Sequence, residues 1–331
     1  MASRFVKVSI VGAVLAAVLA ASASMTLAAP SGTKAGVVIV NTRLAYSGGA
    51  GAGSGIVLTS SGTVLTNNHV IRGAGSIRVT VASTGRTYIA TVAGYSVSKD
   101  IALLRLRNAQ GLQTVQTGNS NTVEVGDRVT AVGNASGTGL STKNGKVTGL
   151  GQSITVSDDG TPVRLTGLIE TTTSLRPGDS GGPLLSGGRV IGIDAAASGG
   201  FHFRDSGQGY AIPINRALKI AGQIEAGRRS STVHVGPTAF LGVALRRASD
   251  DGEDVSGAIV ERVAPGSPAD RAGIGANDVI TSLAGKRVSS LASLKRLVLQ
   301  ASPGQTVRIT WIDPSRGKTS ASVRLVAGPP Q

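Results

Sequence analysis

The 331-residue chain contains no cysteine. This absence excludes disulfide bonds, catalytic thiolates and zinc–thiolate sites, so the fold must be stabilised by packing alone. Aromatic residues make up only 3% of the chain, so valine, isoleucine, leucine and alanine must fill its cores.

Charged residues are also scarce, at 15%, and they are unbalanced. The chain has 33 lysines and arginines but only 18 aspartates and glutamates, which gives a net charge of +15. A basic surface attracts polyanions such as nucleic acid, anionic lipid or envelope polymer. Here the cations are spread along the chain and no aromatic residues are interleaved to stack on bases. The sequence therefore favours no specific nucleic-acid partner, and a polyanion-binding protein remains only a rival interpretation.

The first 29 residues have the pattern of a targeting segment. Arg4 and Lys7 precede an apolar stretch over residues 8–21, and small residues follow. We expect residues 1–29 to be a signal peptide, cleaved after Ala23 or Ala28, or a retained membrane anchor. Either outcome exports the protein, so that it is secreted or anchored to the outer face of the plasma membrane.

Glycine is abundant, with 47 residues, and it separates many short apolar runs between residues 37 and 211. Short runs divided by Gly, Ser, Asn and Thr turns predict a mostly β fold, and their number fits two packed barrels. A helix is expected over residues 213–227 and a polar linker over 228–237. Residues 239–326 then read as a second, smaller domain of strands and two short helices.

The sequence Arg-Pro-Gly-Asp-Ser-Gly-Gly-Pro places Ser180 on a glycine-rich turn. Such a turn exposes a serine and lets neighbouring N–H groups converge, as an oxyanion hole requires. The serine becomes nucleophilic only if a base takes its proton. An α/β-hydrolase elbow would need the acid and the histidine after Ser180 and alternating strands and helices around it. Instead, His69 and Asp100 precede it, in the chymotrypsin-class order.

Three motifs carry a resemblance to a known family: Thr-Asn-Asn-His-Val-Ile at 66–71, Asp-Ile-Ala-Leu-Leu-Arg-Leu at 100–106 and Pro-Gly-Asp-Ser-Gly-Gly-Pro-Leu at 177–184. Together they resemble the HtrA/Deg family of trypsin-like serine proteases. The resemblance implies a trypsin-like double β-barrel over residues 33–227, the linker 228–237, and a small α/β PDZ domain over 238–331. It also implies homotrimers and unfolded polypeptide substrates, and no cofactor or metal is expected.

Each catalytic role follows from the chemistry of its residue. Ser180 is the predicted nucleophile, His69 the base and then the acid, and Asp100 the group that orients His69. The N–H groups of Gly178 and Ser180 are expected to hold the oxyanion. Asp179 departs from the asparagine common in the family, and we expect Arg176 to be its partner.

Two binding sites are predicted from the resemblance. The specificity pocket is expected from Ser174, Leu175 and Ala195–Ala197, none of them acidic, which predicts an aliphatic residue before the scissile bond. The PDZ domain is expected to bind peptide C-termini along a strand at Phe240–Leu245. The residues expected there are Phe240, Leu241, Gly242, Val243, Leu291 and Leu294.

The sequence thus predicts an exported serine endopeptidase that cleaves unfolded or damaged envelope proteins through an acyl-enzyme. The alternative is a chaperone or scaffold that binds unfolded chains and cuts them weakly. Its support is the unusual Asp179, which puts the shape of the oxyanion loop in question.

Overall fold

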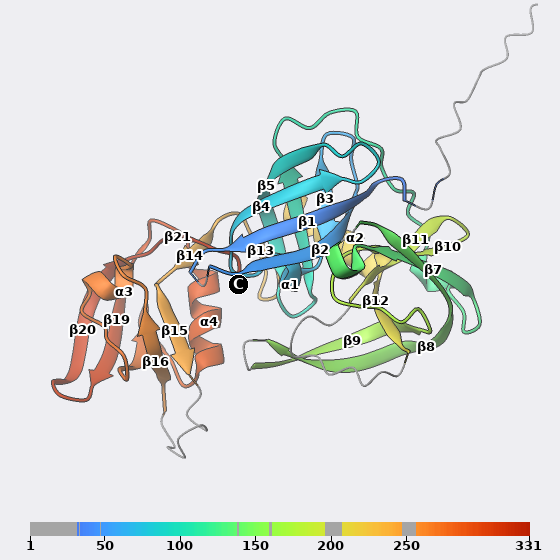
Figure 1. The fold of residues 1–331 in the computed structure, drawn as a ribbon. Coiled ribbons are helices and arrows are strands. Elements are labelled where there is room, and N and C mark those ends of the chain that lie inside the picture. Colours follow the sequence, from blue (N-terminus) through green and yellow to red (C-terminus); the bar gives the residue numbers. More distant parts are fainter. Residues whose placement is uncertain are drawn as a thin grey trace, which may run out of the picture. The chain divides into compact units, whose positions relative to one another are not determined.

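The computed structural model describes residue 32 and residues 34–46, 48–137, 139–158, 161–195, 207–246 and 256–331. The predicted targeting segment, residues 1–29, lies outside them. Within these ranges the chain forms two barrels, a helix and a third sheet with its own helices (Figure 1). The fold is mostly β, as predicted.

The first barrel is built from antiparallel neighbours in the order β5-β4-β1-β2-β3-β6, and it closes because β6 also pairs with β5. Along β1, Val38, Val40 and Thr42 point inward while the intervening side chains are more exposed. This alternation is what a half-buried strand requires. The strands are β1 (Val37–Leu44), β2 (Ala50–Val57), β3 (Thr63–Thr66), β4 (Ala74–Val81), β5 (Thr87–Ser96) and β6 (Ile101–Leu106).

The second barrel is closed in the order β10-β11-β12-β9-β8-β7. Its strands are β7 (Arg128–Gly133), β8 (Ser141–Asp158), β9 (Thr161–Thr171), β10 (Pro183–Ser186), β11 (Arg189–Asp194) and β12 (Gly209–Pro213). Two short 3-10 turns, η1 (Ser120–Thr122) and η2 (Ala135–Gly137), flank β7. Paired six-stranded barrels are what the family resemblance implies.

Helix α2 (Ile214–Glu225) follows the second barrel, where the sequence predicted a helix. Its apolar face includes Ile220 and Ile224 and packs in a core that also holds Leu103 and Ile193. Since Leu103 belongs to β6 and Ile193 to β11, one hydrophobic cluster joins side chains of both barrels to the helix. This shared core fixes the two barrels against each other, and with them the loops they carry.

The expected linker over residues 228–237 is partly a packed structure. Within it, β13 (His234–Val235) pairs with β5, and Val233 is buried in the shared core. The His234 ring packs against Tyr95, with ring centroids 4.9 Å apart, and its Nε2 lies 3.1 Å from the Gly236 carbonyl oxygen. A strand forms in this half of the segment, although it has few apolar residues, because its partner strand β5 is already in place.

The third sheet has the order β15-β16-β17-β19-β20, with β18 paired to β17, and β14 pairs separately with β21. Trp311, Ile309 and Val307 alternate inward along β19 and form its core with Leu294 of α4. The elements are β14 (Thr238–Phe240), β15 (Val243–Arg246), β16 (Ala258–Val263), α3 (Pro268–Arg271), β17 (Val279–Leu283), β18 (Lys286–Arg287), α4 (Leu291–Gln300), β19 (Thr306–Asp313), β20 (Gly317–Arg324) and β21 (Val326–Gly328).

The single strand expected at Phe240–Leu245 is interrupted. It ends at Phe240 in β14 and resumes at Val243 in β15, with Gly242 at φ +93° between them. A Cβ on Gly242 would lie 2.1 Å from the Ser267 Cβ, so only glycine fits this position. The break leaves β15 as the edge strand of the sheet.

No helix in the described ranges is both long enough and apolar enough to span a bilayer.

Candidate active site

The predicted base and its orienting acid are joined in the first barrel. His69 lies on α1 (Asn68–Ile71), a one-turn helix after β3, and Asp100 lies just before β6. The His69 Nδ1 lies 2.8 Å from Asp100 Oδ2, and the main-chain N–H of His69 donates to Asp100 Oδ1 at 2.9 Å. One carboxylate therefore holds both the ring and the backbone of the histidine.

Asp100 is itself held by the strand start. Its φ is +52°, in the left-handed region that aspartate tolerates better than most residues. The Asn67 side-chain amide donates to the Asp100 carbonyl at 2.8 Å, and the Asp100 N–H donates to the Val97 carbonyl. These bonds aim the carboxylate at His69.

The other ring nitrogen of His69, Nε2, is buried and makes no hydrogen bond to any residue that the structure describes. With Nδ1 bound to the carboxylate, Nε2 is the ring atom left to accept a proton. Hydrogen bonds between catalytic groups are often long in the absence of substrate. The imidazole is thus oriented for general-base chemistry.

Ser180 is brought to this pair by contacts between the barrels. Ser180 is buried, with 2% of the residue exposed, and its carbonyl accepts a hydrogen bond from the Ser54 N–H of β2 at 2.7 Å. The Ser54 carbonyl in turn accepts from Thr66 Oγ1 at 2.6 Å, three residues before His69. A Cβ on Gly181 would meet both partners, at 2.1 and 2.3 Å, so glycine allows the loop to approach. All three predicted triad residues are therefore held at the junction of the barrels.

The expected oxyanion loop is fixed by its carbonyl groups. Gly178 has φ +99°, and its carbonyl accepts from Ser54 Oγ at 2.8 Å and from the Asn134 N–H at 3.3 Å. The Ser54 hydroxyl also accepts from Asn134 N at 2.9 Å, which closes a small buried network. These bonds direct the Gly178 carbonyl away into the protein, as an oxyanion site built from N–H groups requires.

Asp179 is buried, and its partners differ from the expected one. Its Oδ2 accepts from the main-chain N–H of Arg176 at 2.8 Å, and it forms an ion pair with Lys143 of β8. Arg176 contributes this N–H, whereas the charge comes from Lys143. Asp194, at the end of β11, is fully buried beside them, and burial together with the nearby Asp179 charge raises the pKa of its carboxyl well above the ordinary value.

The residues expected in the specificity pocket are partly placed. Ser174 Oγ donates to the Gly207 carbonyl at 3.2 Å, Leu175 is half-buried, and the buried Ala195 donates its N–H to Tyr210. Ala197 lies outside the described residues. None of these four residues is acidic, and the prediction of an aliphatic residue before the scissile bond rests on this fact.

The predicted peptide-binding residues lie around the break between β14 and β15. Leu241 and Leu294 are buried in the core of the third sheet, while Val243 and Leu291 are partly exposed. The carbonyls of Leu241 and Gly242 accept from Ala269 and Ala264, so the loop between the strands is fixed.

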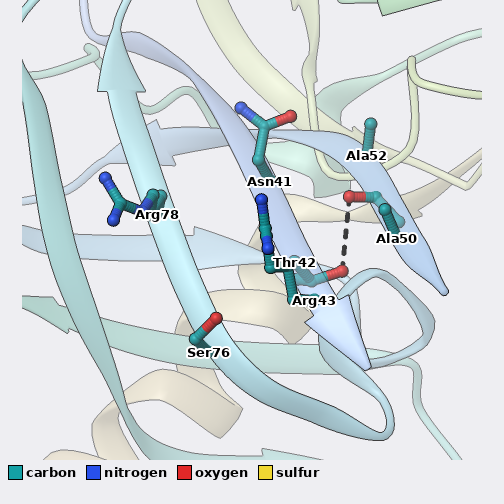
Figure 2. A pocket seen from close by; sticks show the side chains of 8 residues that line it. Asn41, Thr42, Arg43, Ala50, Ala52, Ser76 and Arg78 are labelled. Atoms are coloured by element: carbon teal, nitrogen blue, oxygen red, sulfur yellow. Dashed lines mark hydrogen bonds between the residues drawn. The ribbon is translucent and has the colours of Figure 1, made fainter. Parts of the chain in front are cut away.

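A basic hollow on the outer side of the first barrel shares no residue with these sites. Figure 2 shows two arginines among its lining side chains, one from β1 and one from β4, and the hydrogen bond from Thr42 Oγ1 to the Gly51 carbonyl. Its lining residues are Asn41, Thr42, Arg43, Ala50, Gly51, Ala52, Ser76 and Arg78.

Comparisons with known proteins match both parts of the chain. A family model described as a trypsin-like peptidase domain matches residues 53–193, and a PDZ-domain model matches residues 239–323. The chain is 34% identical over 271 residues to a putative serine protease HhoA of Synechocystis, with 78% of this chain and 67% of that protein covered. It is 37% identical over 278 residues to the periplasmic pH-dependent serine endoprotease DegQ of Escherichia coli, covering 78% and 56%.

Similar solved structures are also HtrA-type proteases. The HtrA-type protease AlgW with a tripeptide is 27% identical, with a TM-score of 0.51 and coverage of 91% of this chain and 97% of that one. AlgW with a decapeptide is 25% identical, with the same TM-score and coverage of 91% and 98%. The chain spans about half to two thirds of the length of the curated relatives it matches.

Proposed function

The chain belongs to the HtrA/Deg family of trypsin-like serine endopeptidases with a PDZ domain, and we propose that it cleaves unfolded or damaged proteins of the cell envelope. The observation that carries the proposal is the His69–Asp100 pair, whose buried Nε2 lacks a partner among the described residues, at the barrel junction that also holds Ser180. This arrangement suits acyl transfer.

The proposed reaction runs through an acyl-enzyme. Ser180 Oγ attacks the scissile carbonyl carbon while His69 Nε2 takes the hydroxyl proton, and Asp100 stabilises the resulting imidazolium. The carbonyl oxygen becomes an oxyanion held by the N–H groups of Gly178 and Ser180, each worth on the order of 3 kcal/mol. The C–N bond then breaks, His69 returns the proton to the leaving amine, and water repeats the sequence on the ester.

The proposed substrate preference is a small or medium aliphatic residue before the scissile bond. The pocket positions Ser174, Leu175 and Ala195 offer an apolar wall and a hydroxyl. A lysine or arginine side chain would enter without an ionic partner from these positions, and an unpaired charge is costly to desolvate. Unfolded proteins expose such aliphatic residues, whereas folded ones bury them.

The third sheet is proposed to bind peptide C-termini. β15 is the outermost strand of its sheet, and an extended peptide can add to such an edge. The turn at Leu241–Gly242 precedes that edge, where N–H groups of residues 240–242 would receive a carboxylate. The apolar side chains of Val243 and Leu291 would contact the last residue.

The proposed location is the envelope. The Escherichia coli relative is named periplasmic, and residues 1–29 have the charge and apolar pattern of an export signal. Retention of this segment as an anchor, and assembly into homotrimers, are proposed on the family resemblance.

Incubation of the purified protein with unfolded casein tests the function. We expect cleavage by the native chain and a loss of several orders of magnitude in the Ser180→Ala variant, which keeps its fold. A labelled fluorophosphonate should mark the native chain and not the variant. If the native chain binds casein without cutting it and is not labelled, the chaperone or scaffold alternative replaces the proposal.

A further inference from the structure

We propose that Lys143 is a positioning residue for the nucleophile loop: its ammonium, paired with the buried Asp179, holds residues 176–180 in the conformation that catalysis needs. This inference rests on the proposed protease function and adds a residue to it. The residue directly before the nucleophile, Asp179, is an acid that is only 1% exposed. A buried carboxylate is costly unless it is paired.

The ion pair joins two distant parts of the second barrel. Lys143 lies on β8 opposite Ala131 of β7, and β7 also pairs with β10, the strand that follows the nucleophile loop. The side chain of Lys143 is 20% exposed, so most of it is covered by protein where it meets the carboxylate. The barrel makes room for the acid at Gly133, where a Cβ would lie 2.5 Å from both Asp179 Cα and Oδ1.

The same carboxylate oxygen also binds the start of the loop. Asp179 Oδ2 accepts from the Arg176 N–H, and the Asp179 N–H donates back to the Arg176 carbonyl at 3.0 Å. Lys143 is therefore tied through one oxygen to the turn that contains Gly178 and ends at Ser180. The position of that turn sets where the proposed oxyanion donors point.

Among the described residues Lys143 forms its ion pair with Asp179, and its charge also acts to lower the pKa of Asp194 beside it. Neither carboxylate oxygen of Asp194 has a hydrogen-bond partner among the residues described, and burial raises the pKa of this carboxyl well above its ordinary value. Removal of the ammonium would leave the Asp179 charge uncompensated in the interior.

The expected response to that loss is a movement of the loop. An uncompensated carboxylate gains solvation only by turning outward, and the backbone between Arg176 and Ser180 must follow it. The N–H groups of Gly178 and Ser180 would then leave the oxyanion position, which lowers kcat.

The test compares Lys143→Met with the double variant Lys143→Met/Asp179→Asn. Methionine keeps the length of the side chain without its charge, and asparagine keeps an acceptor for the Arg176 N–H. We expect Lys143→Met to lower kcat on an unfolded casein peptide about 100-fold, as loss of an oxyanion donor does, with KM changed less than threefold. The double variant should recover at least tenfold of that loss. Lys146→Met, an exposed lysine on the same strand, is the matched control and should keep native kcat.

Each outcome decides the matter. If the native chain cleaves casein and Lys143→Met retains kcat within twofold, the positioning role is wrong while the protease function stands. If circular dichroism shows that Lys143→Met does not fold, the double variant is used instead. A near-native kcat of the double variant supports the positioning role of Lys143. A folded double variant with kcat at least 100-fold below native refutes that role. Equal kcat in the single and double variants, both folded, also refutes it. If the native chain itself does not cleave casein, the proposed function has failed first.

Discussion

Replacement of Asp100 by asparagine should disable the proposed base without disturbing the fold. Asparagine has the same shape as aspartate and tolerates the positive φ found at this position. The carbonyl of residue 100 keeps its hydrogen bond from Asn67, because that bond uses the backbone. The change therefore acts almost entirely on the two bonds that the side chain makes to His69.

The two bonds to His69 cannot both survive with an amide. In the native chain one oxygen accepts from the His69 N–H and the other faces Nδ1, at 2.9 and 2.8 Å. An amide has one oxygen, and the backbone N–H must have it, so the NH₂ group faces Nδ1. Nδ1 then has to accept a hydrogen bond, which places the ring proton on Nε2. A protonated Nε2 cannot take the proton of Ser180.

The magnitude follows from the loss of the correct tautomer. The corresponding change in a protease of the same catalytic class lowers kcat about 10⁴-fold, or about 5.4 kcal/mol of transition-state stabilisation. Both contacts are short here, so we expect a loss of the same order. KM should change little, because the carboxylate acts through His69.

Steady-state kinetics on an unfolded casein peptide measure this loss, with thermal unfolding to show that the fold is kept. Asp127→Asn is a suitable control, since its carboxylate accepts from the Glu124 N–H in a turn of the second barrel and makes no other side-chain bond to the residues that the structure describes. If Asp100→Asn retained kcat within tenfold of native, the tautomer argument would be refuted and His69 would not be the base.

Three further predictions follow from the same geometry. Asp194→Asn should stabilise the protein. Because burial raises the pKa of the Asp194 carboxyl, the unfolded chain loses this proton at a lower pH than the native chain does, so the free energy of unfolding falls as the pH rises above the ordinary value of 3.8. The asparagine variant has no such proton and avoids this loss of stability. Thermal unfolding should show no gain below pH 3.8 and a gain that grows above it; a gain independent of pH would contradict the reasoning. Gly181→Ala should abolish casein cleavage, because its Cβ would lie 2.1 Å from the Ser54 carbonyl oxygen at a φ of +85°; near-native activity would mean that this contact does not position Ser180. Peptides with a free carboxylate and an apolar last residue should bind the native chain in calorimetry more tightly than their amidated forms, and equal affinities would refute the carboxylate site at residues 240–242.

Much of this molecule was predictable because its signals are local. Short apolar runs divided by turn residues predicted the strands, and side chains along β1 and β19 do alternate between buried and more exposed positions. The candidate triad was chosen from the sequence for a different reason: a nucleophile, a base and an acid each need a particular residue type in a particular turn or strand end. The order of the motifs along the chain then selected the fold that brings them together.

The features that the sequence did not predict share a non-local cause. β13 has only two residues, and it is a strand because β5 offers an edge at Tyr95 and Gly94. The break at Gly242 depends on the approach of Ser267, which lies 25 residues away. Neither feature leaves a periodic pattern in its own segment, so propensity and period alone could not find them.

The partner of Asp179 shows how such a contact could be found. The sequence suggested Arg176 because it is close in the chain, and the structure uses the N–H of that residue but takes the charge from Lys143. At the start of β8, side chains at odd-numbered positions are less exposed than their even-numbered neighbours, so Lys143 stands on the inner side with Val147. A lysine at an inward position of a barrel strand needs a buried anion, just as a buried acid beside a nucleophile needs a cation. The inward lysine and the buried acid each have many possible explanations when considered alone. Within one barrel each supplies the opposite charge that the other needs, and for this reason Lys143 is the residue to test.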